Sequence, residues 1–176
     1  MPDIPDTLVL RRHRDLVGVR PYGIWSRWIV LGLLTVLAIL ALFDVFGQRP
    51  VKQTATAPSA SLELYAPEHL RSGLLWSARF HIHARDELKN ATLVLDSGWA
   101  EGMAINTIEP SPIGEASRNG RLALELGHIP KGQSFVLYMQ FQVNATNVAW
   151  RRRQNVELDD GGKQILLLHH HVTIYP

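Results

Sequence analysis

The hydrophobic positions of the chain fall into two different patterns. From Trp28 to Phe43 the sequence WIVLGLLTVLAILALF carries no charge, and it predicts one continuous apolar helix. Extended to Trp25 and Phe46, this run covers about 22 residues, or about 33 Å of helix, which is enough to cross the hydrocarbon core of a bilayer. After residue 60, short runs alternate between apolar and polar residues, which predicts β-strands.

The alternating runs predict an all-β fold. The clearest are 75–84 (LWSARFHIHA) and 135–143 (FVLYMQFQV), and turn residues separate the runs every 8–12 residues or so. This spacing predicts an immunoglobulin-like β-sandwich of seven or eight strands, preceded by one transmembrane helix. The predicted domains are an N-terminal segment 1–23, a transmembrane helix 24–47, a linker 48–60 (QRPVKQTATAPSA) and the sandwich 61–176.

The C-terminal run LLLHHHVTIYP predicts the last strand. A period of two places Leu166, Leu168, Val172 and Ile174 on the core side, with His170 among them. The same period sends the alternate residues outward, namely His169, His171, Thr173 and Tyr175.

Arginine residues around the apolar run predict its orientation. Five of them, Arg11, Arg12, Arg14, Arg20 and Arg27, precede it, whereas Arg49 and Lys52 follow it. The positive-inside rule therefore predicts a single-pass protein of the cell membrane, with a cytoplasmic N-terminus and an extracytoplasmic C-terminal domain. A cleaved signal peptide is the alternative, but its first small-residue triplet, 55–57, lies far downstream and is followed by Pro58. Asp44 is either a residue at headgroup depth or a polar contact with a second membrane protein.

The composition excludes several classes of protein. There is no cysteine, so disulfide frameworks and thiolate zinc sites are excluded. The net charge of +2 gives no reason to expect a nucleic-acid binder. No nucleophile elbow, HExxH motif or phosphate-binding loop occurs, so we expect neither an enzyme nor a cofactor.

Trp150, Arg151, Arg152 and Arg153 form the strongest candidate interaction site. They are either a solvated loop or a docking patch for an anionic partner, because arginine binds carboxylate and phosphate and tryptophan adds contact area. Strand directions predict that this segment lies beside residues 66–73, at the end opposite to where the chain enters the sandwich. That position favours contact with another protein or an anionic envelope polymer.

Two histidine pairs are candidate metal ligands. His81 and His83, and likewise His169 and His171, are two residues apart, so each pair shares one face of a strand. The expected topology puts the pairs on opposite sheets, which argues against one site with four histidines. A divalent-metal-binding or sensing domain is the alternative function.

Two quoted stretches carry a family resemblance. LKNATLVLDSGWAEGMAINTIEP, followed by RLALELGHIPKGQSFVLYMQFQV, resembles the immunoglobulin-like modules of bacterial surface proteins of the DUF11 and CARDB type. The resemblance covers residues 77–143 or so, and it implies a structural spacer or docking surface rather than an enzyme. We therefore expect an accessory or interaction module for another membrane or envelope protein.

Overall fold

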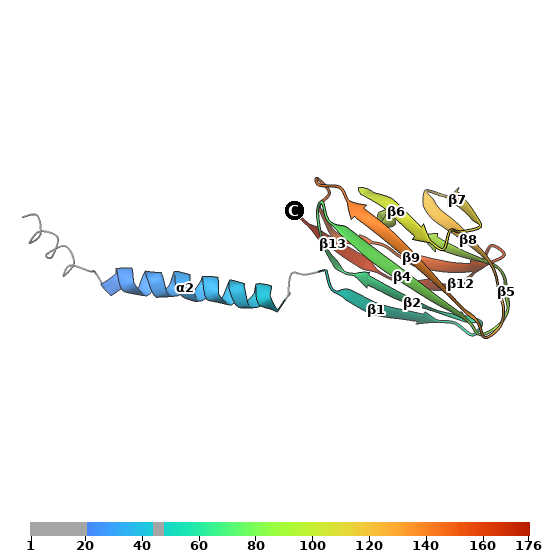
Figure 1. Ribbon diagram of the computed structural model, residues 1–176, viewed down its shortest axis with the longest axis horizontal. Helices are drawn as coiled ribbons and strands as arrows, with labels where there is room; N and C mark the ends of the chain where they lie inside the picture. The colour runs from blue at the N-terminus through green and yellow to red at the C-terminus, as the bar shows by residue number, and fades with distance from the viewer. Residues whose placement is uncertain (1–20, 44–47) are drawn as a thin grey trace, which may run out of the picture. The chain divides into compact units, whose positions relative to one another are not determined.

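The chain divides into two units, each described here by itself. The computed structural model describes residues 21–43 and 48–176. The first unit contains helix α2 (Pro21–Leu42), and the second is a β-domain from Gly47 to Pro176 (Figure 1). Helix α2 has 22 residues, and the side chains described along it are almost all exposed. Of the helices in the described residues, it is the one long and apolar enough to cross a membrane.

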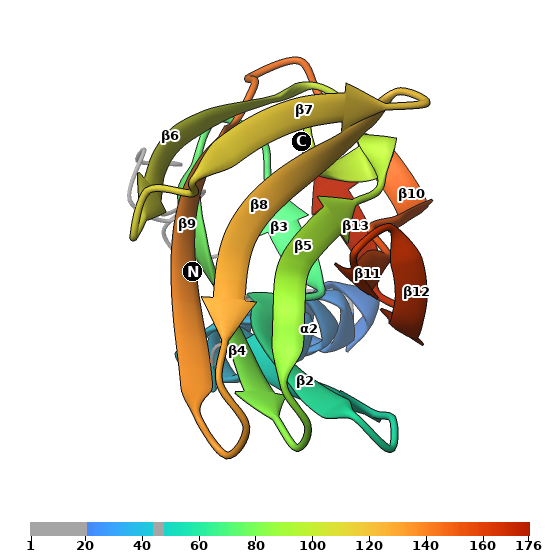
Figure 2. The ribbon, with the colours of Figure 1, turned by 90° about the vertical axis from the view of Figure 1, so that its right-hand side faces the viewer.

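The β-domain is a sandwich of two five-stranded sheets with a smaller third sheet. One large sheet has the order β1-β2-β4-β9-β6 and the other β12-β11-β5-β8-β7, while the small sheet has the order β10-β13-β3 (Figure 2). The strands are β1 (Pro50–Thr56), β2 (Ala60–Pro67), β3 (His69–Arg71), β4 (Leu75–Ala84), β5 (Leu88–Leu95), β6 (Met103–Glu109), β7 (Gly114–Arg118), β8 (Arg121–Ile129), β9 (Ser134–Val143), β10 (Ala149–Arg153), β11 (Val156–Asp160), β12 (Lys163–Leu168) and β13 (His171–Tyr175), and a 3-10 turn η1 spans Ser97–Trp99.

The predicted all-β sandwich with a preceding apolar helix is confirmed. Alternation decides the packing of the long strands, because the apolar residues of β4 and β9 that share one face are buried and their neighbours are more exposed. The number of strands differs from the prediction, since the described residues form thirteen rather than seven or eight. The additional strands are mostly short and polar, and such strands give little alternating signal.

The prediction of a free linker over residues 48–60 is wrong. Residues 50–56 form strand β1, which pairs antiparallel with β2 along its whole length, from Pro50 opposite Pro67 to Thr56 opposite Ser61. Strand β1 lies at the edge of its sheet, and its first three residues are exposed. An edge strand needs little apolar surface because backbone hydrogen bonds on one side hold it.

Strand β1 also changes the end of the sandwich at which the chain enters, and so the predicted position of the arginine-rich segment relative to that entry point. Because β1 adds one more antiparallel strand, the chain enters the sandwich at the end where β2 finishes and β4 begins. Residues 66–73 and the C-terminal strand lie at this same end (Figure 1). We call it the proximal end, and the opposite end, which carries the turn between β8 and β9, the distal end. The arginine-rich segment therefore lies beside residues 66–73, as predicted, but not opposite the point where the chain enters.

The predicted last strand is two strands in different sheets. β12 ends at Leu168, and β13 begins at His171 and belongs to the small sheet. The inward positions are nevertheless as predicted, because the four apolar residues and His170 are all buried. Thr173, which was expected to point outward, is buried as well.

The hydrophobic core belongs entirely to the β-domain. Its buried residues run from Ala60 to Ile174, and none comes from α2. Trp99 is fully buried near the centre, where its ring packs against Trp76, Phe80 and Phe141 at centroid distances of 5.4–5.7 Å. Aromatic packing of this kind contributes beyond the area that it buries. Since the core includes no helix residue, we expect residues 48–176 to fold without α2.

Candidate functional site

A β-bulge in β10 sets the direction of the predicted docking residues. Ala149 lies opposite Ile174 and Arg152 lies opposite Val172, so three steps along β10 match two steps along β13. The extra residue bends the strand, and Arg151 has a φ of +46°. Trp150 is consequently 77% exposed, and Arg151 is exposed beside it. The predicted solvated loop is thus a strand, and its bulge presents two of the four candidate residues to solvent.

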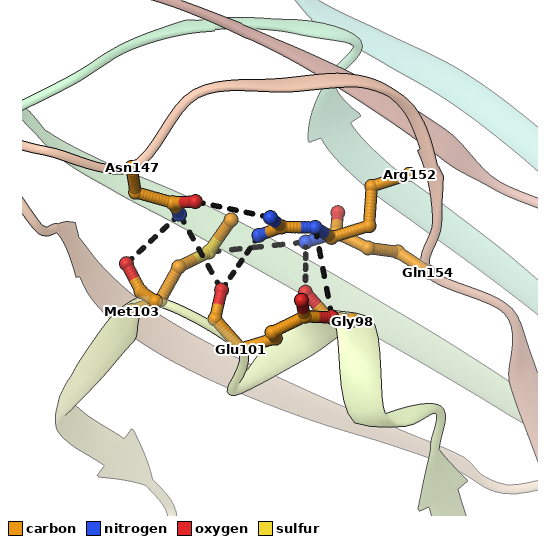
Figure 3. Close-up of polar contacts among 7 residues, drawn as sticks. Gly98, Glu101, Met103, Asn147, Arg152 and Gln154 are labelled. Atoms are coloured by element: carbon orange, nitrogen blue, oxygen red, sulfur yellow. Dashed lines mark hydrogen bonds and ion pairs between the residues drawn. The ribbon is translucent and has the colours of Figure 1, made fainter.

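Arg152 points the other way and holds the bulge in place. Its Nη1 donates to the carbonyl oxygen of Glu101 at 2.6 Å, and its Nη2 donates to Oδ1 of Asn147 at 3.0 Å (Figure 3). Nε lies 3.8 Å from a carboxylate oxygen of Glu101. Asn147 in turn donates to the carbonyl of Gly102 at 2.9 Å. Arg152 therefore has a structural role and is not part of the exposed docking surface.

Buried hydrogen bonds also join the end of β10 to the turn η1. Gln154 is fully buried and donates through Nε2 to the carbonyl of Gly98 at 3.0 Å (Figure 3). The indole Nε1 of Trp99 donates to the carbonyl of Gln154 at 2.9 Å. Because these buried groups have no water to replace a lost partner, the bonds fix the backbone that follows the bulge.

Trp150 and Arg151 line a shallow pocket at the proximal end. Its volume is about 320 Å³, and the other lining residues come from β1, the β2–β3 connection, β3 and β13: Gln53, Glu68, His69, His171, Thr173 and Tyr175. The rings of His69 and Tyr175 stack at a centroid distance of 5.9 Å. We call the exposed residues Trp150, Arg151, His69 and Tyr175, together with His171, the bulge patch. An arginine that lines the same pocket as aromatic side chains suits an anionic group that also offers some flat or apolar surface.

A buried histidine lies behind this pocket. His170 is 1% exposed, its ring stacks on Trp99 at 5.9 Å, and its Nδ1 lies 3.1 Å from Oε1 of Gln53. The amide nitrogen of Gln53 donates to a carboxylate oxygen of Glu68 at 2.9 Å, so its oxygen faces the histidine and accepts the Nδ1 proton. Burial lowers the pKa of His170 to about 4, although the negative charge of Glu68 opposes this shift. His170 is therefore neutral at pH 7 and joins β1 to the wall of the pocket.

The four candidate metal ligands are not brought together. His81 and His83 share one face of β4, as predicted, where Nδ1 of His81 lies 3.6 Å from Glu63 and Nδ1 of His83 lies 3.0 Å from the hydroxyl of Ser134. His169 lies between β12 and β13 with Asn155 at 3.3 Å, whereas His171 begins β13. The premise that His169 and His171 share a strand is therefore wrong. Among residues 21–43 and 48–176, no three His, Cys, Asp or Glu side chains are arranged to hold a metal ion.

The two remaining candidate residues are Asp44 and Arg153. Asp44 lies outside the described residues. Arg153 is exposed and pairs through its backbone with His171, but it does not line the pocket. The sequence predicted that residues 66–73 lie beside the arginine-rich segment, but it did not single out His69, Glu68 or Tyr175 as residues of a pocket. His69 and Tyr175 come together because β3 pairs in parallel with β13. No local signal announces such a pairing, since the two strands are about a hundred residues apart.

Comparisons with known proteins do not identify a family. No protein-family pattern matches the chain, and no curated protein is significantly similar to it. Among solved structures it is similar to AvmM, which catalyses macrocyclization in alchivemycin A biosynthesis (9% identity, 74% of this chain and 90% of that chain, TM-score 0.41). It is also similar to CaCohA2 from Clostridium acetobutylicum (11% identity, 68% and 93%, TM-score 0.45) and to Spo0M, a sporulation control protein from Bacillus subtilis (12% identity, 69% and 51%, TM-score 0.37). Similarity at this level carries no functional argument, and the resemblance to DUF11 and CARDB modules stays a prediction.

Proposed function

We propose that this chain is a single-pass membrane protein whose β-sandwich is an extracytoplasmic interaction module for another membrane or envelope protein. The length and composition of α2 support the membrane span, since its 22 residues cover about 33 Å. The excess of arginine before the helix supports a cytoplasmic N-terminus.

The observation that carries the interaction role is the bulge in β10. A non-glycine residue at positive φ is unfavourable by about 1–2 kcal/mol, and here that residue is Arg151. The same bulge leaves the large ring of Trp150 exposed to solvent. Hydrogen bonds of Arg152 and of the buried Gln154 hold this arrangement. Strain and exposed tryptophan at one place are typical of a binding site rather than of a connecting strand.

The chemistry of the bulge patch favours an acidic partner. The guanidinium of Arg151 forms no ion pair with any residue that the structure describes, so it is available for a carboxylate or another anion. Trp150 and Tyr175 supply flat contact area at a small entropic cost, because each side chain has two rotatable bonds. We infer that the partner presents an acidic side chain beside an apolar one.

Site-specific photocrosslinking in cells that express the full chain tests this proposal. A photoreactive phenylalanine analogue replaces Trp150, and the matched control carries it at Tyr138, which is 50% exposed on β9. We expect one discrete adduct from position 150, which is lost when Arg151→Glu is added, and no such adduct from position 138. Equal labelling from both positions, or an adduct that Arg151→Glu leaves unchanged, would contradict the proposal.

A further inference from the structure

Exposed apolar side chains gather at the proximal end of the sandwich. Within the described part of the β-domain, most of the large hydrophobic residues that are at least 39% exposed lie there, namely Val51, Leu74, Leu75, Val148, Trp150 and Tyr175, whereas Ile113, Tyr138 and Leu167 lie elsewhere. The strand registers place them at this end: Val51 lies opposite Ala66, and Leu75 lies opposite Gln142 near the end of β9. An uneven distribution of this kind indicates a surface that meets something other than water.

The turn between β3 and β4 combines aliphatic and basic groups. Leu74 is 47% exposed and Leu75 is 51% exposed, and Arg71 is exposed three residues before Leu74. Like Arg151, Arg71 forms no ion pair with the described residues. Of the acidic side chains in this region, Glu68 accepts a hydrogen bond from Gln53, and a carboxylate oxygen of Glu101 lies 3.8 Å from Nε of Arg152. The turn therefore presents positive charge beside two exposed leucines.

This combination fits the interface of a bilayer. Leucine side chains enter the boundary between headgroups and acyl chains, while arginine is attracted to anionic headgroups, and tryptophan and tyrosine are enriched at the same depth. The bulge patch supplies the two aromatic residues at the same end of the domain. A partner protein of opposite charge would explain Arg71 equally well, but it would not explain why the exposed apolar groups concentrate where the chain enters the domain.

The chain between α2 and β1 is short, and β1 begins at the proximal end of the sandwich. Helix α2 ends at Leu42 and β1 begins at Pro50, so eight Cα–Cα steps join them, or about 29 Å at full extension. The ten-residue strands β4 and β9 extend the domain by about 33 Å toward the distal end. The connection is therefore shorter than the long strands of the sandwich, and it allows the proximal end, where β1 starts, to meet the surface of a bilayer that holds α2.

We propose that Arg71, Leu74 and Leu75 rest on the anionic headgroup layer of the bilayer that holds α2. This inference depends on the membrane anchoring proposed above. It also restricts the partner, because a sandwich held in this way keeps the bulge patch close to the bilayer. The partner is then a membrane protein that presents its acidic group near the membrane surface, rather than a distant envelope polymer.

Single-cysteine labelling of the full chain tests the contact, since the chain has no cysteine of its own. Leu75→Cys and a distal control, Lys131→Cys, each carry a polarity-sensitive fluorophore; Lys131 is exposed in the turn between β8 and β9. The labelled chains are reconstituted into phosphatidylcholine vesicles, with and without phosphatidylglycerol, that contain lipids with a nitroxide quencher at the headgroup or high on the acyl chain. Flotation of the same vesicles measures anchoring separately.

We expect strong quenching at position 75, more of it with phosphatidylglycerol, and little at position 131. Arg71→Glu combined with Leu75→Cys should shift the contact equilibrium about fivefold or more toward the free domain in phosphatidylglycerol vesicles, because each basic residue contributes that much near an anionic surface. If the chain floats with the vesicles and position 75 is quenched no more than position 131, the membrane contact is wrong while the anchoring stands. If the chain does not float with the vesicles, the proposed membrane anchoring is wrong, and this inference, which depends on it, is wrong as well.

Discussion

Burial of His170 predicts that the β-domain loses stability in mild acid. The pKa of this imidazole falls from 6.5 to about 4 on folding, mainly because burial disfavours the charged ring. The folded state therefore binds fewer protons than the unfolded state between these values. The contribution of neutral His170 to the free energy of unfolding is therefore complete above pH 6.5 or so, and it is lost as the pH falls toward 4.

The size of the effect follows from the two pKa values. A difference between 6.5 and about 4 corresponds to about 3 kcal/mol, at about 1.36 kcal/mol for each pH unit. About 2 kcal/mol of this is already lost at pH 5. Glu68 and His171 are the charged or titratable groups that act on the ring, and they act in opposite directions, so burial sets the sign. For a domain of this size, 2 kcal/mol is a large part of the total stability.

Urea unfolding of residues 48–176 at about pH 7.5 and about pH 5 measures the effect, with His170→Gln as the matched variant. Glutamine does not titrate and can still hydrogen-bond to Gln53. Other groups titrate alike in both proteins, so the difference between their two pH dependences isolates His170. We expect the natural sequence to lose about 2 kcal/mol more than the variant over this range. Parallel losses in the two proteins would refute the reasoning, whatever the stability of the variant at neutral pH.

The remaining predictions concern the core and the bulge, with urea unfolding of the same residues as the measurement. Trp99→Ala should cost about 3–5 kcal/mol, because the ring is fully buried; a loss below 1 kcal/mol or so would contradict its central place. Arg152→Ala should lower the free energy of unfolding by about 1–3 kcal/mol, because it removes the bonds to Glu101. Arg153 is exposed, so Arg153→Ala should change the free energy of unfolding by less than about 0.5 kcal/mol. Equal effects of the two substitutions would contradict their assigned roles. Arg151→Gly should leave stability unchanged or raise it by up to about 1 kcal/mol, because relief of the positive φ offsets the entropy of glycine; clear destabilisation would argue against strain.

The sequence predicts those parts of the fold that depend on strongly alternating burial. β4 and β9 satisfy the pattern because each has one face on the core, and even His170 lies where the period of two places it. β1 escaped prediction because an edge strand held by backbone bonds can be built from polar residues such as Gln53 and Thr54. The break between β12 and β13 is not visible in the sequence either, since the chain changes sheets without glycine or proline and keeps its inward positions.

The candidate site was predicted in composition but not in arrangement. Trp150 and Arg151 stood out as residue types, yet nothing local distinguished them from Arg152, which turns inward to Glu101. That distinction depends on one extra residue in β10 relative to β13, and on a parallel pairing that brings His69 to Tyr175. Both are properties of long-range pairing, which a single sequence does not reveal.

The bulge in β10 and strand β1 together determine which residues form the pocket and the exposed surface at the proximal end. β1 brings the start of the domain to the end that carries Trp150 and Arg151, and its Gln53 bonds to both His170 behind the pocket and Glu68 on its wall. Loss of β1 would therefore remove the Gln53 partner of buried His170 and of half-buried Glu68, and it would open the wall of the pocket. β1 is also the first strand after α2 along the chain. The segment that the sequence presents as a linker is thus the strand whose Gln53 supports both the wall of the pocket and the buried His170.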